Sequence, residues 1–170
     1  TSEKADVERI AFLIDECKKM DVEVLPPNIN ESLKNFTVVP DQNKIRFGFL
    51  AIKNVGTNII DAIVQERKTA GPFTSIGNFV QRVQSKDLNK KSMEALIKAG
   101  VFDAFAERNQ LLTNLERLLE IARESNKSKQ TSQMGLFTSI KTGNDDIRLQ
   151  ETKPASNFER LSWEKELLGL

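Results

Sequence analysis

The chain contains no histidine, a single cysteine and no long apolar run. Without histidine it lacks the side chain that most often transfers protons near neutral pH and most often binds metal ions. The single cysteine, Cys17, excludes an internal disulfide framework and fits a reducing compartment, and its helix-like surroundings favour a small buried side chain. No stretch reaches the ~18 apolar residues that a membrane span needs, and no signal-peptide pattern opens the chain. We therefore expect no membrane contact, no metal ligand and no catalytic residue.

Apolar residues make up 39% of the 170 residues and are unevenly placed. Regular apolar patterning covers residues 7–123, whereas residues 125–157 have almost none and are rich in polar residues. We expect a folded domain over residues 1–125, a flexible tail over 126–157 and a helix over 158–170. That helix stops on an apolar cluster without a polar cap. We therefore expect that the chain was cut from a longer protein and that the helix leads toward a further domain.

The periodicity of the apolar residues predicts a mainly α fold, a small helical domain with one short β-hairpin. The hairpin is expected over residues 36–49, where Pro40–Asn43 separates two β-rich runs. Ser75 and Asn89 are suitable N-cap residues, and Gly100 suits the left-handed position after a helix. The expected helices are 3–20, a short one ending near Lys53, 57–68, 76–83, 90–99, 109–125 and the C-terminal one.

Residues 49–64 have the pattern of a helix-hairpin-helix, in which a tight turn joins two short helices. The second helix begins with unpaired N–H groups, which together with the helix dipole form an anion site. We expect Gly56 to supply the open backbone conformation and to leave no side chain in the way of DNA, and Val55 to point inward. Such turns usually begin with glycine; here Asn54 takes that position, and asparagine tolerates a positive φ.

Positive charge is concentrated around this motif. Residues 44–91 hold 9 Lys and Arg against 3 Asp and Glu, whereas residues 1–43 hold 5 against 9 and residues 92–170 hold 11 against 12. A local excess of this kind is typical of a phosphate-binding surface, with a solvated basic face as the alternative. We expect contacts with the backbone phosphates of duplex DNA, without base readout. The expected DNA-binding residues are Arg46, Lys53, Asn54, Val55, Gly56, Thr57, Asn58, Lys90 and Lys91.

A second, weaker hairpin is indicated further along the chain. Three lysines, Lys90, Lys91 and Lys98, accompany a helix that ends at Ala99–Val101, after which the chain restarts at Phe102. This region either touches DNA or packs beneath the first hairpin.

A short apolar island interrupts the polar tail. It consists of Gln133, Met134, Gly135, Leu136 and Phe137, one polar anchor followed by two apolar ones. Such a peptide suits a hydrophobic pocket on a partner protein and would become ordered on binding. The alternative is that the segment folds back onto the domain.

Several stretches, taken together and in this order, resemble the bacterial replicative DNA polymerase III alpha subunits, the C-family polymerases. They are residues 16–30, 45–56, 71–73, 95–103 and 163–169. The resemblance implies a helix-hairpin-helix module that contacts duplex DNA, followed by a motif for the sliding clamp, which residues 133–137 match. It also implies a role in processive DNA replication in the bacterial cytoplasm, with the clamp and other subunits of the replicative holoenzyme as partners.

The resemblance also indicates what this segment lacks. The polymerase aspartates of the family, which hold two metal ions for phosphoryl transfer, belong to the palm, and the parent polymerase would use Mg²⁺ there. The pair Asp145–Asp146 lies instead in the polar tail, as expected of solvated charges. We therefore expect no cofactor in this segment.

Two other functions stay open. The first is a standalone DNA-repair enzyme, a glycosylase or a structure-specific nuclease, that uses a hairpin of the same kind. A glycosylase of this class has an acidic residue after Gly-Pro, whereas Gly71-Pro72 is followed here by Phe73. The second is a protein-interaction adaptor whose basic stretch is incidental.

Overall fold

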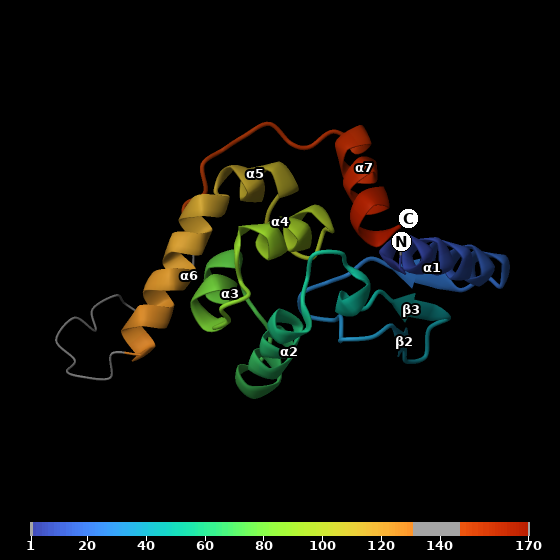
Figure 1. Cartoon of the computed structure of the whole chain (residues 1–170), viewed down its shortest axis with the longest axis horizontal. Coiled ribbons are helices and arrows are strands. Elements are labelled where there is room, and N and C mark those ends of the chain that lie inside the picture. Colours follow the sequence, from blue (N-terminus) through green and yellow to red (C-terminus); the bar gives the residue numbers. More distant parts are fainter. Residues whose placement is uncertain (1, 131–146, 170) are drawn as a thin grey trace.

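Helices dominate the structure, a computed structural model that describes residues 2–130 and 147–169 (Figure 1). The predicted mainly α fold with a short β-hairpin is confirmed. Within the described ranges no helix is both long and apolar enough to cross a membrane. The helices are α1 (Ser2–Lys19), the 3₁₀ helix η1 (Phe49–Ala51), α2 (Thr57–Ala70), α3 (Ile76–Arg82), α4 (Lys90–Lys98), α5 (Arg108–Thr113), α6 (Leu115–Gln130) and α7 (Asn157–Leu168).

A small sheet stands beside α1 at one end of the molecule (Figure 1). Its strands are β1 (Glu23–Leu25), β2 (Thr37–Val39) and β3 (Lys44–Arg46), in the order β1-β3-β2. The predicted hairpin is the antiparallel pair of β2 and β3, in which Val38 lies opposite Ile45. The parallel pairing of β1 with β3, in which Val24 lies opposite Ile45, was not predicted. It depends on a contact across 21 residues, which local patterning does not reveal.

Five phenylalanines are among the largest fully buried side chains of the core. Each is at most 2% exposed, and burial of one such side chain contributes about 1.5–3 kcal/mol. The ring of Phe79 lies edge-on to Phe73 at 5.3 Å and to Phe102 at 4.8 Å between centroids. These contacts join α3 to the loop before it and to the loop between α4 and α5. The five residues are Phe47, Phe49, Phe73, Phe79 and Phe102.

The predicted caps of α3 and α4 are confirmed. The hydroxyl of Ser75 accepts a hydrogen bond from the Asn78 amide at 3.0 Å. The side chain of Asn89 accepts from the Ser92 amide at 3.1 Å, and the Ser92 hydroxyl accepts in return from the Asn89 amide at 3.0 Å. Gly100 follows α4 with a φ of +81°, the left-handed conformation that favours glycine.

The predicted continuous helix over 109–125 is wrong, because Asn114 separates α5 from α6. The buried Asn114 amide group donates to the carbonyls of Gln110 at 2.8 Å and Gln150 at 3.1 Å, and its oxygen accepts from the Gln150 amide at 2.9 Å. Side-chain bonds of this kind compete with helix continuation. The N-cap of α5 is also Glu107 and not a later residue.

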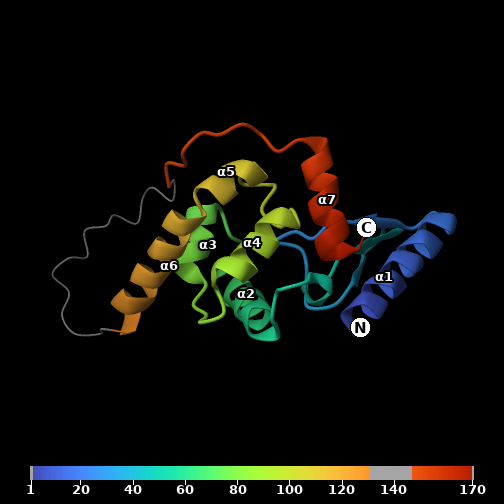
Figure 2. The same ribbon diagram turned by 45° about the horizontal axis from the view of Figure 1, so that its top comes forward.

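Residues 147–156, which we call the strap, pass from α6 over α5 to α7 without regular secondary structure (Figures 1 and 2). Ile147 and Leu149 pack against the core, and the Ala155 amide donates to Glu107 at 2.9 Å. Residues 126–130 belong to α6. Both described edges of the predicted flexible tail are therefore structured, while the division of the chain into domains stays a prediction.

Candidate nucleic-acid interface

The turn of the hairpin joins η1 to α2 through residues 52–56. Asn54 has a φ of +66°, so it occupies the left-handed conformation that the sequence predicts asparagine to tolerate. Val55 is buried at 7% exposure, also as predicted. The isoleucines that hold the two helices together are almost completely buried: Ile52, Ile59, Ile60 and Ile63.

Gly56 differs from the prediction in its backbone conformation. Its φ of −78° and ψ of 160° are open to any L-residue, so the backbone does not require glycine here. The unusual conformation belongs to Asn54 instead. A Cβ atom on Gly56 would have no described heavy atom within 4 Å. The glycine therefore leaves clear space directly in front of the first turn of α2.

This first turn is open to solvent and has the polarity of an anion site. Gly56, Thr57 and Asn58 are exposed, and Gly56, as the N-cap, offers no side-chain acceptor. The first N–H groups of a helix lack partners within the helix, and the dipole places partial positive charge at the same end. The first turn contains no acidic residue. An oxyanion in front of Gly56 would therefore meet several free donors.

Several basic side chains of residues 44–91 are bonded to other groups of the fold. Arg46 donates to the carbonyl of Pro26 at 2.9 Å and pairs with Glu31. Arg67 donates to two backbone carbonyls at 2.7 and 2.8 Å, and burial lowers the pKa of its guanidinium. Arg82 pairs with Glu66 at 3.0 Å. These three arginines are among the nine basic residues of residues 44–91, which we call the basic segment.

The remaining candidate lysines differ in how they are paired. Lys90 forms an ion pair with Glu116 at 2.7 Å, which raises the pKa of Lys90 and lowers that of Glu116. Within the described residues neither Lys53 nor Lys91 forms an ion pair. Lys53 lies in the turn itself and Lys91 in the first turn of α4. Together with Asn54, Lys91 lines a hollow of about 120 Å³.

The second predicted hairpin has a filled turn. A Cβ atom on Gly100 would collide with the side chains of Arg108 and Asp103. Arg108 is only 4% exposed and occupies the space beside this turn. The first and second turns therefore differ in access, because only the first leaves room for a ligand at its glycine. This arrangement favours the packing role over the DNA-binding role for the second hairpin.

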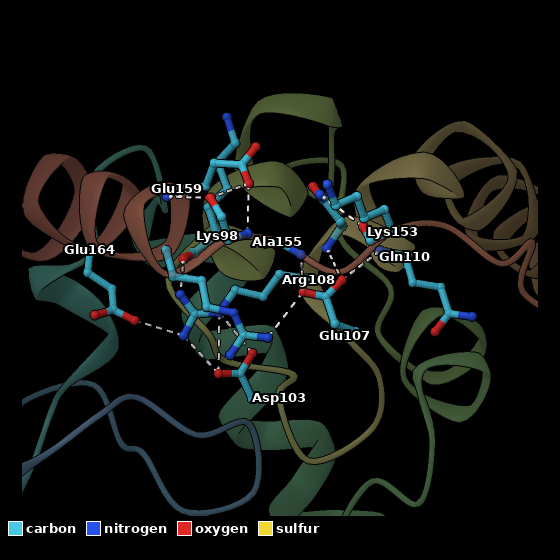
Figure 3. A network of polar contacts seen from close by, with 12 residues as sticks. Lys98, Asp103, Glu107, Arg108, Gln110, Lys153, Ala155, Glu159 and Glu164 are labelled. Atoms are coloured by element: carbon cyan, nitrogen blue, oxygen red, sulfur yellow. Dashed lines mark hydrogen bonds and ion pairs between the residues drawn. The ribbon is translucent and has the colours of Figure 1, made fainter.

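A network of polar contacts that sequence reasoning missed surrounds Arg108 (Figure 3). Arg108 donates to Asp103 at 2.8 and 2.9 Å, to the Lys98 carbonyl at 3.0 Å, and pairs with Glu164 of α7 at 2.8 Å. Burial lowers the pKa of the Arg108 guanidinium, but the two carboxylates outweigh it and the net pKa is raised. No local pattern identifies a pair separated by 56 residues in the chain.

The neighbouring residue Glu107 connects α5 to the strap and to α7. One carboxylate oxygen accepts from the amides of Asn109 at 2.7 Å and Gln110 at 3.2 Å. The other accepts from the Ala155 amide at 2.9 Å and from Arg160 at 3.1 Å. Burial raises the pKa of Glu107, but these hydrogen bonds outweigh it and the net pKa lies below its ordinary value.

Two of the predicted features lie outside the residues that the structure describes. The predicted clamp peptide, residues 133–137, and the pair Asp145–Asp146 fall outside the described residues. Within the described residues no group of three or more His, Cys, Asp and Glu is placed to hold a metal ion.

Comparison with known proteins gives matches of two kinds. The family described as "Helix-hairpin-helix motif" matches residues 21–111. Proteins named DNA polymerase III subunit alpha match the chain along its length: 39% identity over 100% of the chain in Deinococcus radiodurans, 38% over 99% in Thermus aquaticus and 41% over 100% in Chlamydia pneumoniae. The chain spans 13 to 14% of the length of these relatives. It therefore belongs to the helix-hairpin-helix motif family, and it is similar along its length to a segment of these DNA polymerase III alpha subunits.

Proposed function

We propose that this chain is the module of a replicative polymerase alpha subunit that holds duplex DNA by its phosphates and binds the sliding clamp. The observation that carries the DNA-binding part is the open N-terminus of α2 at Gly56, where a Cβ atom would meet only open space. In this proposal the chain supports processive DNA synthesis and catalyses no step. The polymerase activity, its Mg²⁺, the other holoenzyme subunits and the cytoplasmic location belong to the parent protein.

The chemistry of the proposed DNA contact follows from the turn. A phosphate in front of Gly56 accepts hydrogen bonds from the amides of the exposed residues Thr57 and Asn58, which have no partners within the helix. The left-handed Asn54 and the buried Val55 set the direction of the turn, and the Lys53 ammonium adds positive charge beside it. These groups meet the DNA backbone alone, so binding is indifferent to sequence.

The affinity of such a contact is modest. A module that neutralises few phosphates binds in the non-specific range of roughly 10⁻⁴ to 10⁻⁶ M at physiological salt. Arg46 is left out of this contact because its guanidinium is already used by Pro26 and Glu31. Lys91 extends the contact from α4, next to Asn54.

A salt titration tests this proposal. The chain is titrated with two unrelated duplexes at several salt concentrations, alongside Lys53→Ala and the control Lys18→Ala, which removes an exposed lysine from α1. We expect equal affinity for both duplexes and a salt slope that falls by about 0.9 in Lys53→Ala only. Salt-independent binding, or equal losses in both variants, would contradict the contact at the turn.

The clamp-binding part of the proposal rests on the residues of the peptide and on the resemblance to alpha subunits. Leu136 and Phe137 would enter an apolar pocket on the clamp, Gln133 would form a hydrogen bond at its rim, and Gly135 would let the backbone bend between them. Met134 completes the peptide. A five-residue contact that must also become ordered fits micromolar affinity, ~8 kcal/mol.

The position of this peptide in the chain suits a tether. It lies between the end of α6 at Gln130 and the start of the strap at Ile147, and the strap is held by Asn114 and Glu107. Binding to a ring that encircles DNA raises the effective concentration of the DNA-binding turn near the duplex. Two weak contacts would then together support processive synthesis.

The alternative functions have less support. In a repair glycosylase the residue after Gly71-Pro72 would be an acid facing DNA, but Phe73 is 2% exposed in the phenylalanine core. A protein-interaction adaptor would show no salt-dependent DNA binding in the titration described above. Glycosylase and nuclease assays on the purified chain separate the enzyme from the module.

A further inference from the structure

The C-terminal helix α7 forms a backbone hydrogen bond with the turn between η1 and α2. The backbone N–H of Lys53, the residue just before Asn54, donates to the carbonyl of Leu167 at 3.1 Å. Leu167 and Leu168 are 3% and 1% exposed, so the last turn of α7 lies in the core at the same point. The backbone of the turn is therefore bonded to an element that follows it by more than 100 residues.

Burial alone does not determine how α7 lies along the domain. Phe158 and Leu161 in its first half are 78% and 64% exposed. Polar contacts hold the helix instead: Arg160 in this half donates to Glu107 at 3.1 Å, and Glu164 in the second half pairs with Arg108 at 2.8 Å. The orientation of α7 therefore depends on ion pairs with α5, and the position of the Leu167 carbonyl depends on that orientation.

Of these contacts, the pair between Arg108 and Glu164 lies nearest in sequence to Leu167. Arg108 is fixed independently of α7 by Asp103 and by the Lys98 carbonyl. Its side chain is 5% exposed, whereas that of Glu164 is 28% exposed. Arg108 is thus a rigid anchor on the second hairpin, and Glu164 is the group through which α7 attaches to it (Figure 3).

We propose that Glu164 is a positioning residue for phosphate binding: its ion pair with Arg108 orients α7, and the Leu167 carbonyl then holds the Lys53 amide and the turn. The inference rests on the proposed DNA contact at Gly56 and extends it, because it connects the open first turn to the filled second one. Glu164 itself touches no phosphate. It acts only through the backbone of the turn.

The test compares the full 170-residue chain with Glu164→Gln and with Glu120→Gln, an exposed glutamate on α6. Both changes remove one negative charge, which on its own would strengthen DNA binding. We expect Glu164→Gln instead to weaken duplex binding by about three- to ten-fold, with an unchanged salt slope because no phosphate contact is lost. Glu120→Gln should bind as tightly as the unchanged chain, or slightly more tightly.

Amide hydrogen exchange distinguishes positioning from general loss of stability. In Glu164→Gln the Lys53 amide should lose protection, while the Ile60 amide, which donates to the Gly56 carbonyl, should keep it. A urea titration gives the change in the free energy of global unfolding. This change should be smaller than the loss of opening free energy that hydrogen exchange measures at the Lys53 amide. Protection lost equally at both amides would overturn the proposal, because the residue would then act on the whole fold.

Two further outcomes are decisive. If the Lys53 amide stays protected, or if it loses protection while DNA affinity stays unchanged, Glu164 does not position the site. If the unchanged chain fails to bind duplex DNA, the proposed function fails, and the exchange data alone decide whether Glu164 holds the turn.

Discussion

Gly56→Asp should make the protein more stable and make it bind DNA less tightly. Gly56 is the N-cap of α2 and has a backbone conformation that aspartate adopts without strain. Replacing glycine restricts the unfolded chain and gains about 0.4–1 kcal/mol. The aspartate would also cap the helix and place a negative charge at the positive end of its dipole, which adds a few tenths of a kcal/mol to about 1 kcal/mol of stability. We expect a net gain of about 1 kcal/mol and a rise in Tm of about 2–4 °C for a chain of this size.

The same carboxylate should occupy the phosphate site. It would accept hydrogen bonds from the first amides of α2, and its charge would repel DNA from the position that Gly56 leaves clear. Loss of these contacts should weaken binding by at least ten-fold, which corresponds to about 1.4 kcal/mol. Because the variant is expected to be more stable, unfolding cannot account for such a loss.

The assay is duplex binding by fluorescence anisotropy together with thermal unfolding of the same samples. Thr152→Asp is the matched control, because it adds the same charge at an exposed position of the strap. It should bind DNA nearly as tightly as the unchanged chain. The reasoning is refuted if Gly56→Asp and Thr152→Asp bind equally well, or if Gly56→Asp lowers the Tm.

Three further predictions concern the turn, the strap and the tail. Asn54→Gly should keep the free energy of unfolding in urea, whereas Asn54→Val should lose about 1–2 kcal/mol because valine resists a φ of +66°. The folded pKa of Glu107 is lowered, so its contribution to stability is complete above the unfolded pKa of about 4.3 and is lost as pH falls through the folded pKa; Glu107→Gln should flatten the pH dependence of the urea midpoint below about pH 5. Leu136→Ala combined with Phe137→Ala should abolish binding to purified sliding clamp in calorimetry and leave DNA binding unchanged; equal binding by both chains, or by neither, would contradict the clamp peptide.

Local signals in the sequence were enough to predict many of the elements. Ser75, Asn89 and Gly100 act as caps through bonds to residues at most a few positions away, so their roles can be predicted without tertiary structure. Asn54 could be predicted to adopt a positive φ for the same reason. The prediction for the Gly56 backbone was wrong because Asn54 and Gly56 can both adopt a positive φ. Only the structure shows that Asn54 is the residue that does so.

Features that depend on distant partners could not be predicted. Asn114 interrupts the helix between α5 and α6, and two of the hydrogen bonds of its amide group are made with Gln150, 36 residues later. Arg46 belongs to the basic segment by composition, but the fold pairs it with Glu31. The ion pair between α5 and α7 likewise joins Arg108 and Glu164, which are distant in the chain. In each case the deciding interaction is set by tertiary packing.

The most direct test of the central claim, that the N-terminus of α2 binds DNA phosphates, is an NMR titration of the ¹⁵N-labelled chain with two unrelated duplexes. We predict that the largest amide shifts fall on residues 53–59 and are the same for both duplexes, because the contact is made with the DNA backbone. Shifts that leave these amides unchanged, or that concentrate at the turn around Gly100, would contradict the account.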